Sequence, residues 1–380
     1  MTLAQVTRMD LASYRTEKKE LQELIAHLEG LLASEAKMVT LVKDEMQAIV
    51  TEFGDERRTG ILADEDAAAP VAEIRSAIES KPVLVALTAD GGLKAMPANT
   101  YSGKTNAGTV RGDERLISVQ RALTTDYLLC QLSTGRVASV RVAKLPETTR
   151  AARAEPPRSL LSLDPGERVV AVVPVGAFSE EVFLVVFTRE GRAKKTALSE
   201  YLKVDEKGSP DLKLLGKDSV VCALVSPGGG DYVVTTSDAK TLRFSDGDLR
   251  AAGRVGQGVA AIGLSAGAAV VGADRIGSDD ERALWVASSN GFVKRSALSD
   301  YPRKGRATGG VATMQLPPMT VLIAAAVVST GEDAILVTQS GRTGRLSASE
   351  APLVARDRRG ASGIKLEAPD ELSRLVVVPA

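Results

Sequence analysis

The chain has 380 residues, of which 44% are hydrophobic and 25% charged, a composition typical of folded proteins that excludes disorder along its whole length. Its 48 basic and 48 acidic residues give no net charge, and no apolar run approaches the roughly 18 residues of a membrane span. Without a signal-peptide pattern, a cytoplasmic protein with no membrane partner is expected. Cys130 and Cys222 lie in separate apolar runs, which predicts buried thiols rather than a disulfide or a metal site.

Charge is distributed unevenly along this neutral chain. Residues 1–80 hold nine basic and sixteen acidic residues, which leaves 39 basic and 32 acidic residues for 81–380. The two parts are therefore expected to have different functions.

Residues 1–54 carry the pattern of two helices. Apolar residues recur at spacings of three and four over 21–32 and again over 38–53, with a break near Ala33. The two stripes predict an antiparallel hairpin that closes on its shared apolar faces. Residues 55–80 are acidic, alanine-rich and bounded by proline, which predicts a linker that leads into a first strand.

Residues 81–380 change to the patterns of β-structure. Short runs of Val, Ile and Leu are each followed by a turn and a second, often basic run. The turns are DGGLKAM (90–96), TGRVASV (134–140), EGRAKKT (190–196), DAKTLRF (238–244), NGFVKRS (290–296) and SGRTGRL (340–346), aligned on Gly92, Gly135, Gly191, Lys240, Gly291 and Gly341. Six units of roughly 50 residues predict a closed, propeller-like array, because one unit cannot bury both of its faces alone.

Cations recur at equivalent places in these turns and in the loops that follow them. A closed ring brings equivalent positions to one rim, so a curved basic band is expected there. The alternative is that these cations only solvate an exposed edge strand and deter edge pairing. The candidate binding residues are Arg136, Arg192, Lys194, Lys195, Lys240, Arg243, Lys294, Arg295, Arg303, Lys304, Arg306, Arg342, Arg345, Arg358 and Arg359.

Three stretches carry a resemblance to a known family. The sequence EFGDERRTGI (52–61), with the two-helix pattern before it, and the blade sequences GRAKKTALSEY (191–201) and GFVKRSALSDY (291–301) resemble the A subunit of bacterial type IIA topoisomerases, DNA gyrase and topoisomerase IV. The resemblance runs through essentially the whole chain. It implies a mainly β fold, a six-bladed β-pinwheel over 81–380 that binds and bends duplex DNA, preceded by the end of the breakage-reunion coiled coil.

The resemblance also implies partners and a missing activity. The family's catalytic tyrosine follows an arginine, whereas none of the six tyrosines here does. The chain should therefore belong to an ATP-hydrolysing isomerase but cleave nothing alone. The implied partners are double-stranded DNA, the N-terminal breakage-reunion part of a dimeric A subunit, and the ATPase B subunit. The resemblance also implies that the protein is associated with the nucleoid. ATP and Mg are expected only in the whole enzyme, with no cofactor or metal in this chain.

Gyrase carries a Gln-Arg-Arg-Gly-Gly-x-Gly type box in its first blade, and this box is absent from the corresponding TYSGKTNAGTVRGDERL (100–116). Looser glycine-cation loops occur instead in YPRKGRATGG (301–310) and RDRRGASG (356–363). Topoisomerase IV is therefore favoured, with a gyrase whose box has diverged as the alternative.

Two other interpretations of the sequence lead to different functions. GLSAG (263–267) matches the nucleophile turn of hydrolases, but strand-like residues follow it and the one histidine, His27, lies far upstream, so a serine hydrolase is not expected. A propeller whose basic rim meets an acidic protein stays open as a second class.

Overall fold

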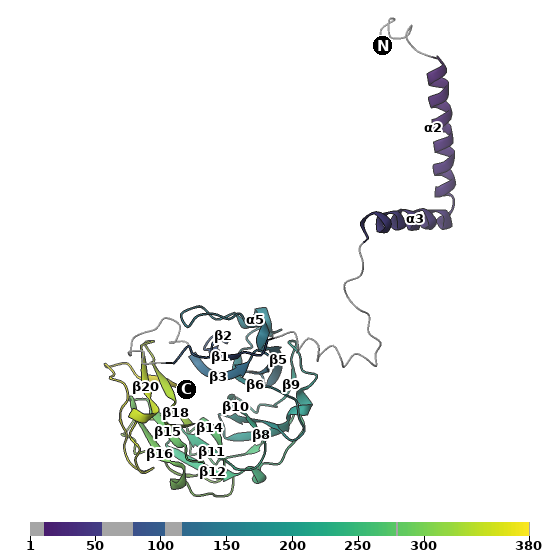
Figure 1. Ribbon diagram of the computed structural model, residues 1–380. Helices are drawn as coiled ribbons and strands as arrows, with labels where there is room; N and C mark the ends of the chain where they lie inside the picture. Colours follow the sequence, from purple (N-terminus) through teal and green to yellow (C-terminus); the bar gives the residue numbers. More distant parts are fainter. Residues whose placement is uncertain (1–10, 55–78, 103–115, 279, 380) are drawn as a thin grey trace. The chain divides into compact units, whose positions relative to one another are not determined.

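The computed structural model describes residues 11–54, 79–102, 116–278 and 280–379 (Figure 1). It forms two compact units, Met1–Val71 and Ala72–Ala380. The first contains a pair of long helices, and in the second the regular structure is mainly strands, joined by loops and short helical turns. The predicted mainly β fold with a helical pair before it is confirmed. The expected linker lies mostly outside the described residues, and the first described strand begins at Pro82.

The two helices are α2 (Leu11–Leu32) and α3 (Glu35–Phe53). The prediction that they close on their apolar faces is wrong, because side chains of both stripes, such as Leu28 and Ile49, are exposed. Ala33 and Ser34 separate the helices, and a connection of this length is compatible with a hairpin, so it is the exposure of the two stripes that contradicts the prediction. Within the described part of the chain, neither helix is apolar enough over sufficient length to cross a membrane.

The described residues of the second unit form six antiparallel sheets, called blades 1 to 6 in chain order. Blade 1 contains β1 (Pro82–Thr88), β2 (Leu93–Pro97) and β3 (Leu116–Leu123), and blade 2 contains β4 (Tyr127–Leu132), β5 (Arg136–Arg141), β6 (Val169–Val175) and β9 (Ser209–Pro210). Blade 3 contains β7 (Phe183–Thr188), β8 (Arg192–Ala197), β10 (Val220–Ser226) and β13 (Val259–Ala260), and blade 4 contains β11 (Asp231–Thr236), β12 (Lys240–Ser245), β14 (Val270–Ile276) and β17 (Val311–Ala312). Blade 5 contains β15 (Ala283–Ser288), β16 (Phe292–Ala297), β18 (Leu322–Val328) and β21 (Ala361–Ser362), and blade 6 contains β19 (Asp333–Thr338), β20 (Thr343–Ser347) and β22 (Leu372–Val378).

The outermost strand of blades 2 to 5 is supplied by the next blade: it lies in the segment that follows the hairpin of that blade. Thus β9 follows β8 of blade 3 but pairs with β5 of blade 2, where Arg136 lies opposite Pro210. In blade 1 the same place is taken by a bridge between Leu93 and Glu155, whose backbone groups exchange hydrogen bonds of 3.0 and 2.8 Å. Consecutive blades are therefore joined by exchanged strands.

We call the segments that make this exchange crossing loops 1 to 5. Each begins after a short 3₁₀ helix at the end of a hairpin and runs to the outer edge of the preceding blade. The 3₁₀ helices are η3 (Val142–Lys144), η4 (Leu198–Tyr201), η5 (Asp246–Asp248), η6 (Leu298–Asp300) and η7 (Ala348–Glu350). The crossing loops are 145–162, which contains α5 (Pro157–Leu160), and 202–213, 249–263, 301–315 and 351–363.

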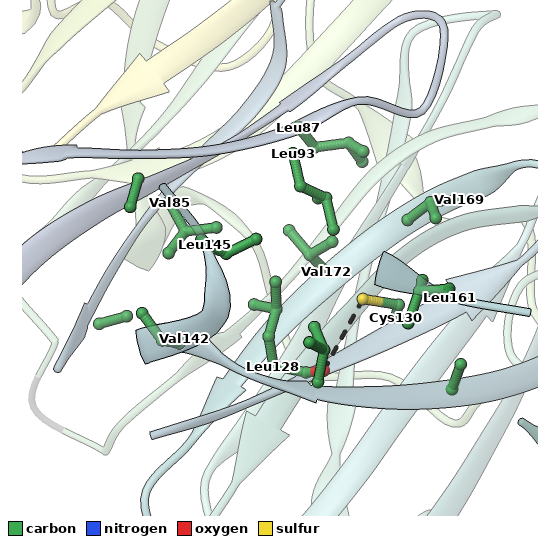
Figure 2. Close-up of a cluster of buried hydrophobic side chains, with 14 of the residues drawn as sticks. Val85, Leu87, Leu93, Leu128, Cys130, Val142, Leu145, Leu161, Val169 and Val172 are labelled. Atoms are coloured by element: carbon green, nitrogen blue, oxygen red, sulfur yellow. Dashed lines mark hydrogen bonds between the residues drawn. The ribbon is translucent and has the colours of Figure 1, made fainter. Parts of the chain in front are cut away.

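Apolar cores lie between consecutive blades. Figure 2 shows the core between blades 1 and 2, in which the Cys130 thiol packs among Leu93, Leu128 and Val172. The last core joins blade 1 to blade 6, so the blades close into a ring. Cys130 and Cys222 are free, as predicted, and burial raises the pKa of both thiols to about 12.

The hairpin turns share one backbone feature. In each of the six hairpins, one turn residue has a positive φ, and it stands two residues before the first residue of the second strand that pairs with the first strand. These residues are Gly91, Gly135, Gly191, Ala239, Gly291 and Gly341. The sequence alignment is therefore off by one residue at Gly92 and Lys240. Glycine takes this conformation at little cost, which explains why five of the six turns have it.

Candidate nucleic-acid interface

The two adjacent lysines of blade 3 lie on β8, next to the outermost strand, and are buried within the protein. The Lys194 side chain is 1% exposed, and its Nζ lies 2.5 Å from Asp211 Oδ1 and 2.6 Å from the Asp211 carbonyl oxygen. Lys195 Nζ lies 2.8 and 2.7 Å from the two carboxylate oxygens of Asp246. Burial lowers the pKa of Lys194, and the neighbouring Asp211 carboxylate opposes that shift.

The corresponding pair of blade 5 is buried in the same way. Lys294 Nζ donates hydrogen bonds of 2.8 and 2.7 Å to the carbonyl oxygens of Ala355 and Arg356. Arg295 Nε donates to the Ala351 carbonyl oxygen at 3.1 Å. The expectation that Lys194, Lys195, Lys294 and Arg295 are exposed is therefore wrong. The exchanged strands β13 and β21 pair only with the first residues of β8 and β16, and the crossing loops continue along the same edge, with bridges from Lys195 to Ala251 and from Arg295 to Leu353. The crossing loop of the next repeat therefore covers the edge that a single repeat leaves open.

Four further candidates on the second hairpin strands are engaged within the protein. Each is partly buried and bonds to an acidic residue or a loop carbonyl. The pairs are Arg136 with Glu167 at 2.8 Å, Arg192 with the Gln257 carbonyl at 2.9 Å, Arg243 with Asp231 at 2.6 Å and Arg345 with Asp333 at 2.7 Å. Lys240 and Arg342, beside the turns, are more exposed and lie 3.1 and 3.7 Å from Asp238 and Glu367. These arrangements join strands and loops of the ring.

The remaining five candidates lie on crossing loops 4 and 5. Lys304 is exposed, and the Arg358 side chain is 75% exposed. The Arg359 guanidinium lies 4.4 Å from the centre of the Phe292 ring. Arg303 and Arg306 each bond within the protein, Arg303 to Asp231 and Arg306 to the Asp248 and Ala260 carbonyl oxygens. Apart from Arg342 beside the blade 6 turn, the exposed part of the predicted band thus lies on crossing loops rather than on strands.

Crossing loops 1 to 3 also carry exposed cations, which sequence reasoning missed. They are Arg153, Lys203, Lys213 and Arg250, whose side chains form no hydrogen bond or ion pair within the described part of the chain. Each stands between a 3₁₀ helix and an outermost strand or just after that strand, as do the cations of YPRKGRATGG and RDRRGASG. The candidate loop cations came only from 301–310 and 356–363; a search of the equivalent loop in every repeat would have found these four residues.

Backbone hydrogen bonds connect each crossing loop to the next. Four representative bonds run from Ser162 N to Glu206 O at 2.9 Å, Lys213 N to Gly256 O at 3.0 Å, Ala307 N to Ala261 O at 2.7 Å and Gln315 N to Arg358 O at 3.4 Å. Loops that would otherwise move independently thereby form a continuous belt along blades 1 to 5. The belt gives the exposed cations fixed places on a curved perimeter.

Val255 in crossing loop 3 has φ 67° although its side chain is β-branched and the residue is 61% exposed. Left-handed backbone costs an L-residue about 1–2 kcal/mol, whereas glycine adopts it freely and loses about 0.5–1 kcal/mol to chain entropy. We therefore expect Val255→Gly to raise the free energy of unfolding by about 0.5–1 kcal/mol in urea denaturation. Val259→Gly, in the neighbouring strand β13, is the control and should lower it; a loss at both positions would refute strain at Val255.

These features define a class of protein: a six-bladed, strand-exchanged β-propeller with cations on its outer loops. The model of the family described as "DNA gyrase C-terminal domain, beta-propeller" matches residues 126–175, 183–227, 231–276, 286–328 and 332–379, more than half of the chain. The chain belongs to this family.

Curated relatives and solved structures agree with this assignment. The chain is 29% identical over 381 residues to the DNA gyrase A subunit of Staphylococcus epidermidis, covering 96% of this chain and 41% of that protein. It is 33% identical to the DNA gyrase A subunit of Escherichia coli (strain K12), covering 81% and 35%. The chain thus spans about two fifths of the length of these relatives.

Two solved structures share the fold. The C-terminal domain of DNA topoisomerase IV superposes with a TM-score of 0.66 at 21% identity, over 79% of this chain and 94% of that one. A DNA gyrase A C-terminal domain gives 0.64 at 19% identity, over 78% and 99%. The predicted pinwheel-like ring of six blades is confirmed.

Proposed function

We propose that this chain is the DNA-binding and DNA-bending C-terminal module of the A subunit of a type IIA topoisomerase. The observation that supports this best is the belt: five consecutive crossing loops each present at least one exposed cation, and hydrogen bonds connect them. Lys and Arg along such a path neutralise phosphates and release counterions, which supplies affinity without reading sequence. Aromatic residues make up only 3% of the chain, which disfavours a single-strand stacking platform.

Bending follows from the shape of the perimeter. A duplex that contacts several loops of a ring must curve, and smooth bending of 20–30 base pairs costs about 1–6 kcal/mol. Contacts with additional loops offset this cost, so the bound length of DNA and its curvature rise together. In the whole enzyme, we propose that this module presents the bent duplex to the N-terminal breakage-reunion part of a dimeric A subunit, beside an ATPase B subunit that uses ATP and Mg.

The choice between topoisomerase IV and gyrase rests on opposing observations. The first-blade stretch 100–116 lacks the glycine-arginine box, which favours a topoisomerase IV-like module, whereas the curated relatives carry the gyrase name. Residues 103–115 lie outside the described part of the chain. We propose the topoisomerase IV-like interpretation, with a diverged gyrase as the alternative. Relaxed circular DNA bound by the chain and then treated with a type I topoisomerase separates them, because a positive wrap changes the linking number.

The test of DNA binding is an anisotropy titration of the full chain with duplexes of two unrelated sequences at several salt concentrations. We expect similar affinity for both and a slope of log affinity against log salt of about −4.5 or steeper, since five or more phosphates are neutralised. A slope near zero would refute the proposal. Binding to polyglutamate that DNA fails to displace would instead favour a protein-interaction platform.

A further inference from the structure

The six blades are of two alternating kinds. In blades 1, 3 and 5 the third residue after the turn glycine is a buried lysine and the tenth is a buried tyrosine. These residues are Lys94, Lys194 and Lys294, and Tyr101, Tyr201 and Tyr301. Blades 2, 4 and 6 have small or apolar residues at the same two places: Ala138, Leu242 and Gly344, and Leu145, Leu249 and Ala351. The ring therefore repeats every two blades, and the buried lysine belongs to one kind only.

Two of these lysines bind the backbone of the crossing loop on their own blade. Lys94 Nζ donates to the carbonyl oxygens of Arg150 and Ala152 at 2.7 and 3.1 Å. Lys294 Nζ makes the equivalent bonds to crossing loop 5, at 2.8 and 2.7 Å. Lys194 instead bonds to Asp211, next to crossing loop 2's outermost strand. Blades 1 and 5 thus share one way of fixing a loop.

In crossing loop 5, the segment that the buried lysine holds also carries exposed arginines. The two carbonyls that Lys294 binds belong to Ala355 and Arg356, and Asp357 alone separates them from the two exposed arginines, Arg358 and Arg359. Lys294 forms no salt bridge within the described residues. Asp300, Asp357 and Arg356 are the charged groups that act on it, and burial lowers its pKa to about 8, so it is an ammonium at pH 7.

A buried ammonium is costly unless its N–H groups are hydrogen-bonded, and the loop carbonyls satisfy two of its three donors. The lysine and the loop therefore depend on each other. Arg356 adds a second attachment, since its Nη1 donates to the Ala312 carbonyl at 2.8 Å on the neighbouring crossing loop.

We propose that Lys294 is a positioning residue for nucleic acid: it does not touch DNA, but it fixes crossing loop 5 so that Arg358 and Arg359 face the duplex. The inference rests on the proposed DNA binding and adds which buried group controls one of the contacts.

The first test uses Lys294→Met without DNA. Limited trypsin digestion, with mass spectrometry of the new termini, should show cleavage after Arg358 and Arg359 about tenfold faster than in the wild type, because the loop opens more often. Cleavage after Lys203 should not change. Leu242→Met, at the equivalent place in blade 4, is the matched control and should leave crossing loop 5 protected. Equal cleavage rates at Arg358 and Arg359 in both variants would overturn the proposal.

The single tryptophan reports whether the variant folds. Trp285 is fully buried in β15, which pairs with Lys294's strand, so its emission should stay that of a buried indole. If Lys294→Met exposes Trp285, Lys294→Gln replaces it; glutamine is shorter and cannot reach both carbonyls, so the same results are expected.

The second test is a double-mutant cycle on the salt slope of DNA affinity. Lys294→Met should make the slope shallower by up to about 1.8, since two phosphate contacts are lost. In a chain that already carries Arg358→Ala and Arg359→Ala, Lys294→Met should add nothing further. An unchanged slope in the single variant, with normal wild-type binding, overturns the positioning role alone. A wild type that does not bind DNA overturns the proposed function as well.

Discussion

Replacing Lys213, Arg250, Lys304 and Arg358 by alanine together is expected to make the salt slope of DNA affinity shallower by up to about 3.6, because one phosphate contact is lost from each of four crossing loops. Between 50 and 200 mM salt, the loss of affinity should then be smaller by about 10²-fold. Folding should hardly change, since exposed substitutions of this kind typically alter stability by no more than about 0.5 kcal/mol each. Anisotropy titrations paired with a thermal melt measure both effects.

The first unit of the chain offers a control with the same change in net charge. Lys18, Lys19, Lys37 and Lys43 are exposed on α2 and α3, and replacing all four by alanine removes four cations that are not part of the belt. We expect the salt slope of this variant to remain within about one unit of the wild type. If both variants lose slope equally, the belt has no special role and binding depends on net charge alone.

Sequence patterns were sufficient for the blades because each hairpin is specified locally. Val- and Leu-rich runs and the turns between them identify every hairpin, apart from shifts of one residue at Gly92 and at Lys240, where Ala239 takes the place of the turn glycine. The exchanged strands escaped prediction, because β9 and β13 are two residues long and β9 ends in Pro210. No periodicity can appear over such a length.

The same short strands explain the misplaced site. Lys294 and Arg295 lie on consecutive positions of a strand, and lysine is rarely buried, so the sequence favours an exposed edge for them. Their burial requires residues of crossing loop 5, which come from some sixty residues further along the chain. The acceptors for Lys294 are main-chain carbonyls, which leave no signature in the side-chain sequence.

The Asp211 carboxylate accepts hydrogen bonds from side chains of both blade 2 and blade 3. Its carboxylate accepts from Lys194 Nζ at 2.5 Å, Tyr201 Oη at 2.8 Å and Gln131 Nε2 at 3.0 Å, and the residue is 1% exposed. Its carbonyl oxygen also accepts from Val255 N at 2.6 Å, which extends the contact to crossing loop 3. Loss of this side chain should therefore affect two blades and the belt together.

Asp211→Ala is expected to lower the free energy of unfolding by about 3–5 kcal/mol, because it leaves the buried Lys194 ammonium without its counter-ion. Urea denaturation followed by circular dichroism measures the loss, and Asp248→Ala, which removes an exposed carboxylate, is the control. Adding Lys194→Met should recover part of the loss, since the unpaired charge disappears.

The loss of unfolding free energy in Asp211→Ala should also depend on pH, and should be largest near pH 7. It should shrink as the pH rises toward 10.5, because Asp211 opposes the lowering of the Lys194 pKa by burial, and its loss lowers the folded-state pKa further below the unfolded value. In that window the unfolded chain binds more protons than the folded one, by a larger margin in the variant, so the variant gains more stability with pH than the wild type. A cost no larger than that of Asp248→Ala, or a double variant as unstable as Asp211→Ala at every pH, would show that the ion pair does not hold blades 2 and 3 together.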